Sequence, residues 1–226
     1  PAGLCRRNAA GVRAISTTHQ DDFETVVRMF GKEARRLAKL IHPNIVGVRD
    51  AFDEQGTAYM ALEFVEGRDL ADVIAHEPER LDPARLRSMT MQLLDAVAHI
   101  HEAGTLHRDI SPDNILLRPD GTPVLIDFGA ARDRARRATR ALSTLQVVKD
   151  GYSPQEFYLA GSDQAYSSDL YALAATFYHV VSRKAPPSSH SRLAATAREK
   201  RDPLEPLGDV DGILGPGDVQ GASIVI

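Results

Sequence analysis

The chain has 226 residues, of which 43% are hydrophobic and 26% are charged, a composition typical of a globular protein with a substantial core. Its formal net charge of −4 argues against nucleic acid as a partner, because such proteins carry a basic surface. The single cysteine, Cys5, excludes an internal disulfide framework and a cysteine-rich zinc site. No apolar run approaches roughly 18 residues, so attachment to a membrane would require a region outside this sequence.

The first third of the chain is predicted to contain a loop, one helix and two strands. Residues 1–24 show no sustained hydrophobic period and predict a loop. In residues 25–41 apolar side chains recur every three or four positions, which predicts an amphipathic helix. Residues 45–48 and 58–64 are apolar and rich in strand-forming types, and a turn at 54–56 separates the two strands that they predict.

The rest of the chain is predicted to be mainly helical. The expected elements are, in order, a short helix at 70–75, a long helix at 83–103, a hairpin of 115–117 and 124–126, and a second buried helix at 169–182. The long helix has the clearest boundaries, since Asp82 is a favourable N-cap, Pro83 suits the first helical position, and Gly104 marks the end.

Two short motifs place an acid, an amide and a second acid at fixed intervals. The triplet His107-Arg-Asp109 is followed by Asn114, and the triplet Asp127-Phe-Gly129 begins 127 − 109 = 18 residues after Asp109. Phosphoryl transfer uses such a set: one carboxylate orients the attacking hydroxyl, while an amide oxygen and a second carboxylate hold Mg²⁺ on the nucleotide phosphates. A capped turn explains either motif alone, but it does not explain both in this order.

These motifs resemble the catalytic loop and the metal-binding motif of the protein kinase family, over about residues 25–205. The later segment Gly151-Tyr-Ser-Pro-Gln-Glu156 is similar to that of bacterial serine/threonine kinases. The resemblance implies an α+β, two-lobed protein-kinase-like fold, with a partial small β-rich N-lobe at 1–66, a mainly helical C-lobe at 67–206, and an atypical tail at 207–226.

The resemblance also implies roles for individual residues. Asp109 would be the catalytic carboxylate, Asn114 and Asp127 the magnesium ligands, Arg108 the partner of a phosphate on the activation segment, and Asp169 a buried brace beneath the catalytic loop. The implied ATP-binding residues are Glu33, which pairs with a phosphate-anchoring lysine, Glu63 and Val65, whose backbones contact adenine, Leu116 in the pocket, and Asp69 near the ribose. His107 and Phe128 would stack with Leu37 in a column that aligns the lobes.

Three features depart from the family pattern. The glycine-rich phosphate loop and the anchoring lysine that should precede Glu33 are not found, so we expect the lysine-bearing strand to lie before Pro1. Ser111 stands where most family members have a lysine that neutralises the transferring phosphate. In the family, the arginine that pairs with the residue at Glu156 lies in a late helix, but the resemblance fades after Pro206. We therefore expect that this chain is truncated at both ends relative to the family.

We therefore expect a cytoplasmic serine/threonine protein kinase that uses ATP and Mg²⁺ and acts on a protein substrate. One alternative is a pseudokinase or inactive fragment that only binds partners, as the missing phosphate loop and Ser111 suggest. Another is a small-molecule phosphotransferase, which shares the motif at 107–114 but not the segment at 151–156. The arginines between 132 and 140 form either a solvated loop face or a site that orders a phosphorylated Ser143 or Thr144.

Overall fold

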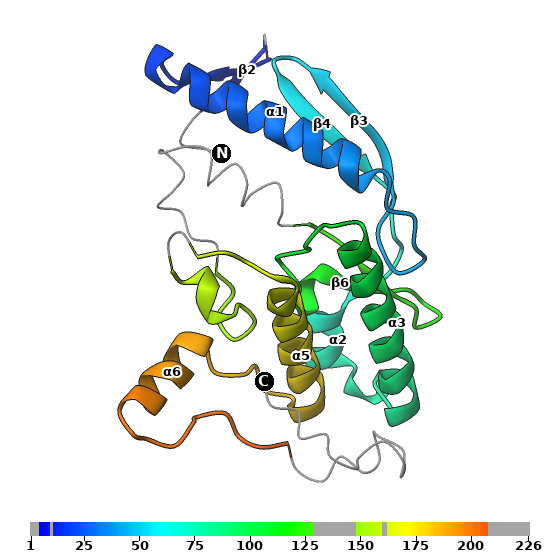
Figure 1. The fold of residues 1–226 in the computed structure, drawn as a ribbon. Helices are drawn as coiled ribbons and strands as arrows, with labels where there is room; N and C mark the ends of the chain where they lie inside the picture. The colour runs from blue at the N-terminus through cyan, green and yellow to red at the C-terminus, as the bar shows by residue number, and fades with distance from the viewer. Residues whose placement is uncertain (1–4, 10, 129–147, 160–161, 208–226) are drawn as a thin grey trace.

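The computed structural model describes residues 5–9, 11–128, 148–159 and 162–207, and it divides into a strand-rich part and a helical part (Figure 1). The strand-rich part consists of β1 (Cys5–Asn8), β2 (Gly11–Ala14), α1 (Gln20–Leu37), β3 (Val48–Glu54) and β4 (Thr57–Leu62). The helical part contains α2 (Leu70–His76), α3 (Pro83–Glu102), α5 (Tyr166–Ser182) and α6 (Ser189–Ala197). This division confirms the predicted fold class.

Two short strands lie where the sequence predicts a loop. β1 and β2 pair antiparallel, with Cys5 opposite Ala14 and Asn8 opposite Gly11. The prediction of a loop over residues 1–24 is wrong because each strand has only four residues and β1 is mostly exposed, so neither shows the apolar alternation that reveals a longer strand.

Helix α1 begins at Gln20 rather than Thr25 and ends at Leu37 rather than Ile41. Its first turn carries two aspartates, which favour a helix N-terminus electrostatically but give no apolar signal. Phe23 extends the buried face toward that end, whereas Ile41, predicted to lie on this face, is 85% exposed because the helix has already ended.

Strands β3 and β4 form an antiparallel hairpin closed by Gln55 and Gly56, so the predicted turn is confirmed. The strand predicted at 45–48 is displaced, because β3 starts only at Val48. Ile45 and Val46 instead reach the helical part. Ile45 forms a parallel bridge with Leu125, and Val46 donates its backbone N–H to the Leu125 carbonyl at 2.9 Å.

The end of α1 is fastened to the helical part by further polar contacts. The Arg36 guanidinium donates to the carbonyl oxygens of Ala103, at 2.9 Å, and Gly104. The Asn44 side chain donates to the carbonyl of Pro123 at 2.7 Å. Because these acceptors follow α3 or precede Asp127, α1 has a fixed position relative to the predicted catalytic segments.

The helical part follows the sequence prediction more closely. The side chain of Asp82 caps α3 by accepting the N–H of Arg85 at 2.9 Å, and Pro83 occupies the first helical position, as predicted. Helix α5 begins at Tyr166 rather than Asp169, and α6 was not predicted.

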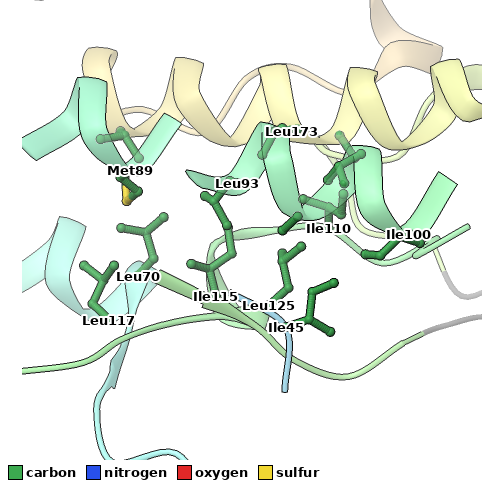
Figure 2. Packing of buried hydrophobic residues seen from close by; sticks show 14 of the residues in the cluster. Ile45, Leu70, Met89, Leu93, Ile100, Ile110, Ile115, Leu117, Leu125 and Leu173 are labelled. Carbon is green, nitrogen blue, oxygen red and sulfur yellow. The ribbon is translucent and has the colours of Figure 1, made fainter. Parts of the chain in front are cut away.

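A small antiparallel sheet carries the predicted catalytic segments. Its strands are β5 (Arg68–Asp69), β6 (Ile115–Leu117) and β7 (Pro123–Leu125), in that order. Strand β6 starts directly after Asn114, and β7 ends two residues before Asp127. Figure 2 shows Ile115 and Leu125 of this sheet pointing into the same core as Leu93 and Leu173, so the sheet is anchored by fully buried side chains.

Within the residues that the structure describes, no helix combines the length and the apolar character needed to cross a membrane.

Candidate active site

The segment from His107 to Asn114 is held from below by a carboxylate of α5. Asp169 is 1% exposed and accepts the backbone N–H groups of His107 at 2.9 Å and Arg108 at 2.8 Å. The same carboxylate lies 2.9 Å from Nε2 of His101, a contact that the sequence did not reveal. These partners compensate the cost of burying a carboxylate, and the predicted brace is confirmed.

Asn114 connects the two predicted catalytic segments. Its side-chain Nδ2 donates to the carbonyl of Asp109 at 2.7 Å, and its own carbonyl accepts the N–H of Ile126 at 3.0 Å. Because the amide nitrogen points into the loop, Oδ1 is the end of the side chain left to face a ligand. The structure thus brings Asp109, Asn114 and Asp127 to one end of the β6–β7 hairpin.

The backbone at both motifs adopts a conformation that side chains rarely accept. Arg108 has a φ of 67° and Asp127 a φ of 57°, both in the left-handed region. Such a residue costs about 1–3 kcal/mol and persists only where its surroundings dictate its conformation, most often at functional sites. The Asp169 brace and the anchored β7 strand provide those surroundings.

His107 and Phe128 pack against each other beneath these motifs, with ring centroids 4.6 Å apart. His107 is fully buried, and this burial lowers its pKa although carboxylates lie nearby, so the ring is neutral at pH 7. Leu37 of α1 belongs to the same buried cluster as Phe128. The His107–Phe128 stacking of the predicted column is therefore confirmed, and Leu37 contributes to the core that contains Phe128.

A cation that the sequence did not reveal lies beside Asp109. Nζ of Lys149 is 2.7 Å from Oγ of the fully buried Ser111, 2.7 Å from Oδ2 of Asp113, and 3.4 Å from Oδ1 of Asp109. Burial alone would raise the pKa of the Asp113 carboxyl, but the hydrogen bond and the charge of Lys149 hold that pKa below its ordinary value.

An apolar surface lies next to the segment that connects the two parts of the molecule. Val65 is buried with Val46 and Val124, and Leu116 and Ile126 pack against this cluster while remaining partly exposed. Its accessible part consists of Leu116 and Ile126, whose apolar side chains fit a flat aromatic ring of a ligand.

The other predicted nucleotide contacts are partly engaged by the protein itself. The N–H of Glu63 donates to the carbonyl of Gly47 at 2.7 Å, so a contact from Glu63 to a base would come from its carbonyl oxygen. Asp69 caps α2 by accepting the N–H of Asp72 at 2.7 Å with one carboxylate oxygen.

Glu33 lies on the inward face of α1 and is only 1% exposed. The strand that directly precedes α1 is β2, and the β1–β2 hairpin carries Arg6, Arg7 and Arg13 but no lysine. This hairpin, found where a loop was predicted, does not supply the lysine partner implied for Glu33.

Glu156 accepts a hydrogen bond from the hydroxyl of Ser168 in α5, in place of the late arginine that the family pattern implies. Neither this contact nor that of His101 has a local sequence signal, because each partner comes from a regular helix. Several predicted features lie outside the described residues: Gly129, the arginines between 132 and 140, Ser143, Thr144 and positions 208–226 of the tail.

Comparison with known proteins gives a consistent result. The protein kinase domain family matches residues 5–207. The chain is 29% identical over 195 residues to the probable serine/threonine-protein kinase CPE1738 of Clostridium perfringens, covering 85% of this chain and 28% of that protein. It is 30% identical over 201 residues to serine/threonine-protein kinase PknA of Mycobacterium tuberculosis, covering 87% of this chain and 46% of PknA.

A solved structure, the PpkA-294 apo form, superposes with a TM-score of 0.73 at 33% identity and covers 92% of this chain and 70% of that one. The chain spans less than half the length of the two curated relatives.

Proposed function

The chain belongs to the protein kinase family, and we propose that it transfers the γ-phosphoryl group of ATP to serine or threonine hydroxyls of protein substrates. The observation that carries this proposal is the set of Asp109, Asn114 and Asp127, gathered at one end of a hairpin and braced by Asp169. The relatives named as serine/threonine-protein kinases support the choice of acceptor.

In the proposed reaction Asp109 accepts a hydrogen bond from the substrate hydroxyl and aligns its oxygen with the γ-phosphorus. A bond forms between that oxygen and phosphorus while the bond to the bridging oxygen breaks, ADP leaves with the bridging oxygen, and the hydroxyl proton passes to the Asp109 carboxylate. The side chain of Asp109 is 10% exposed, so little water competes for it. This arrangement makes positioning the main contribution of the protein.

Asn114 and Asp127 fit a magnesium ion. Mg²⁺ prefers oxygen ligands, and these side chains offer an amide oxygen and a carboxylate. The bond from Asn114 Nδ2 to the Asp109 carbonyl holds the amide so that its oxygen, not its nitrogen, faces a ligand. When bound, Mg²⁺ would neutralise the charge of the nucleotide phosphates.

We assign the nucleotide to the space beside the apolar surface of Val65 and Leu116. Adenine would lie against this surface, with backbone contacts from Glu63 and Val65, and Asp69 would face the ribose with the carboxylate oxygen that does not cap α2. Glu33 would belong to the phosphate end of the site, and Arg108 would bind a phosphorylated activation segment.

Replacement of Asp109 by asparagine tests the proposal. The change preserves shape but removes the proton acceptor, so turnover with a serine- or threonine-containing protein substrate should fall at least ~10²-fold. Asp120→Asn is the matched control, because Asp120 is an exposed acid in the β6–β7 turn. Equal turnover in wild type and Asp109→Asn would refute the assignment.

A binding protein without transferase activity is the second candidate. The absence of lysine from the β1–β2 hairpin before α1, together with Ser111, favours it. A thermal melt with and without Mg·ATP, followed by a transfer assay, separates the two candidates. A nucleotide-dependent shift with phosphate incorporation supports the kinase, whereas a shift without incorporation supports the binding protein.

A further inference from the structure

The ammonium group of Lys149 lies beside the side chain at position 111, 2.7 Å from the hydroxyl oxygen of Ser111. Lysine has three N–H donors, and two of them are used at 2.7 Å by Ser111 and Asp113. The third lies on the side of Asp109, whose Oδ1 is 3.4 Å away, an ion-pair distance rather than that of a strong hydrogen bond. Among the described residues the third donor thus meets only the Asp109 carboxylate, beside which we place the transferring phosphoryl group.

The backbone of Lys149 is held in a tight turn that fixes where this ammonium lies. Its N–H donates to Oγ of Ser153 at 3.0 Å, and its carbonyl accepts the N–H groups of Tyr152 at 3.0 Å and Ser153 at 2.9 Å. Gly151 has a φ of +88° and lies so close to the rest of the chain that a Cβ there would be 2.5 Å from the carbonyl oxygen of Pro186.

Two contacts, one part-buried and one buried, tie this turn to the helices. The hydroxyl of Tyr152 lies 2.7 Å from Nδ1 of His179 in α5, and the hydroxyl of Ser189 in α6 donates to the carbonyl of Ser153 at 2.9 Å. The cation is thus oriented in advance by the helical part, as a group that stabilises developing charge must be.

We propose that Lys149 is a catalytic residue whose ammonium contacts the γ-phosphoryl group, supplying from a segment 38 residues downstream the positive charge that position 111 supplies in most family members. This inference rests on the proposed phosphotransferase function. As the new O–P bond forms and the bridging bond breaks, Lys149 keeps its protons and donates a hydrogen bond to a phosphoryl oxygen. Ser111 holds the ammonium in place through its buried hydroxyl.

A purely structural role explains the site less well. The side chain of Asp113 is 57% exposed, and ion pairs with such exposed carboxylates contribute little to stability. The ammonium lies 3.4 Å from Asp109, at the carboxylate that we assign to the reaction. A charge that acts on the phosphoryl group explains both contacts.

The test measures kcat, and KM for ATP, in four variants. Lys149→Met removes the charge at similar length, Lys149→Arg keeps it, and the double variant Ser111→Lys/Lys149→Ser exchanges the two residues. Lys184→Met is the matched control, because Lys184 also pairs with a carboxylate, Glu205 at 3.1 Å, far from the site. Thermal melts establish that each variant is folded.

We expect Lys149→Met to lower kcat ~10²-fold, the scale for losing one group that stabilises transition-state charge, and to raise KM for ATP roughly tenfold, because the ammonium also contacts the γ-phosphoryl group of the bound nucleotide. Lys149→Arg and the exchanged variant should each recover at least roughly tenfold, one decade of that loss. A kcat for Lys149→Met close to that of an active wild type, or an exchanged variant that is folded and no faster than Lys149→Met, would overturn the inference.

Nucleotide affinity separates this inference from the proposed function. Isothermal titration should show that Lys149→Met weakens Mg·ATP roughly tenfold more than Mg·ADP, because the ammonium meets the phosphate that ADP lacks. If wild type transfers no phosphate, the proposed function fails. The contact between Lys149 and the γ-phosphoryl group is still supported if Lys149→Met weakens the binding of ATP alone. It is refuted if the variant weakens ATP and ADP equally, or neither of them.

Discussion

Replacing Asp169 by asparagine should loosen the whole catalytic loop although the side chain never meets a substrate. The carboxylate accepts two backbone N–H groups, at 2.9 and 2.8 Å, and contacts His101 at 2.9 Å, all within a site that is 1% exposed. An asparagine keeps one acceptor oxygen but turns an NH₂ group toward a second donor. One buried N–H is then unsatisfied, at about 1–3 kcal/mol, and the hydrogen bonds that remain lose the charge that strengthened them.

Together these terms predict a loss of about 2–4 kcal/mol in the free energy of unfolding, measured by urea denaturation. Turnover should fall at least ~10-fold at temperatures where the variant remains folded, since small displacements of a positioned group are costly. Asp95→Asn is the control, because this carboxylate is 78% exposed and contacts only His42 among the described residues, at 3.0 Å. Equal losses in the two variants would refute the idea that the loop depends on this brace.

Three further predictions concern the core, the turn that holds Lys149, and pH. Leu93→Ala, at a fully buried position, should lower the free energy of unfolding by about 2–5 kcal/mol. Leu94→Ala, at a 40% exposed position, should lower it far less. Equal urea midpoints for the two variants would contradict the described core. Gly151→Ala should destabilise more than Gly121→Ala in thermal melts, because both have a φ of +88° but only Gly151 faces a clash; the reverse order would exclude that clash. Burial lowers the pKa of His179 in the folded protein. Below about pH 6.5 the unfolded chain therefore binds a proton at this residue more readily than the folded chain does. The free energy of unfolding should fall as pH decreases, by at most about 1.4 kcal/mol per pH unit from this group. Urea midpoints at pH 7.5, 6.5 and 5.5 should fall less steeply in His179→Gln, and an unchanged slope would exclude this histidine as a cause.

The features that the sequence predicts correctly have local causes. Helix α3 begins where Asp82 and Pro83 specify a start, and β6 and β7 flank a turn at Asp120-Gly121. The contacts within the segment from Asp109 to Asn114 are also local, because the spacing of residues along a constrained loop determines which groups can meet. The stacking of His107 on Phe128 was instead implied by the family resemblance, since both residues belong to its motifs.

The features that the sequence did not reveal depend on distant or weak signals. Ile45 and Val46 have the composition of a strand, but their partner is Leu125, so the contact that uses them is tertiary. Lys149 is the only lysine between Lys39 and Lys184, yet nothing near it in sequence identifies Ser111 and Asp113 as its partners. Only the folded chain brings them together.

The polar contacts that join α1 to the helical part lie near its C-terminal end, whereas the helix otherwise packs on β2, β3 and β4. Arg36 and the following residues Asn44–Val46 hold the pivot near Leu37, whereas Gln20 begins the helix roughly 26 Å away, at 1.5 Å of rise per residue. A tilt of about 10° about that pivot would move the distal end by about 4.5 Å but Glu33, roughly 6 Å from the pivot, by only about 1 Å. Such a tilt would therefore displace Glu33 only about a quarter as far as the distal end of α1, so the phosphate end of the site is the less sensitive of the two to this motion.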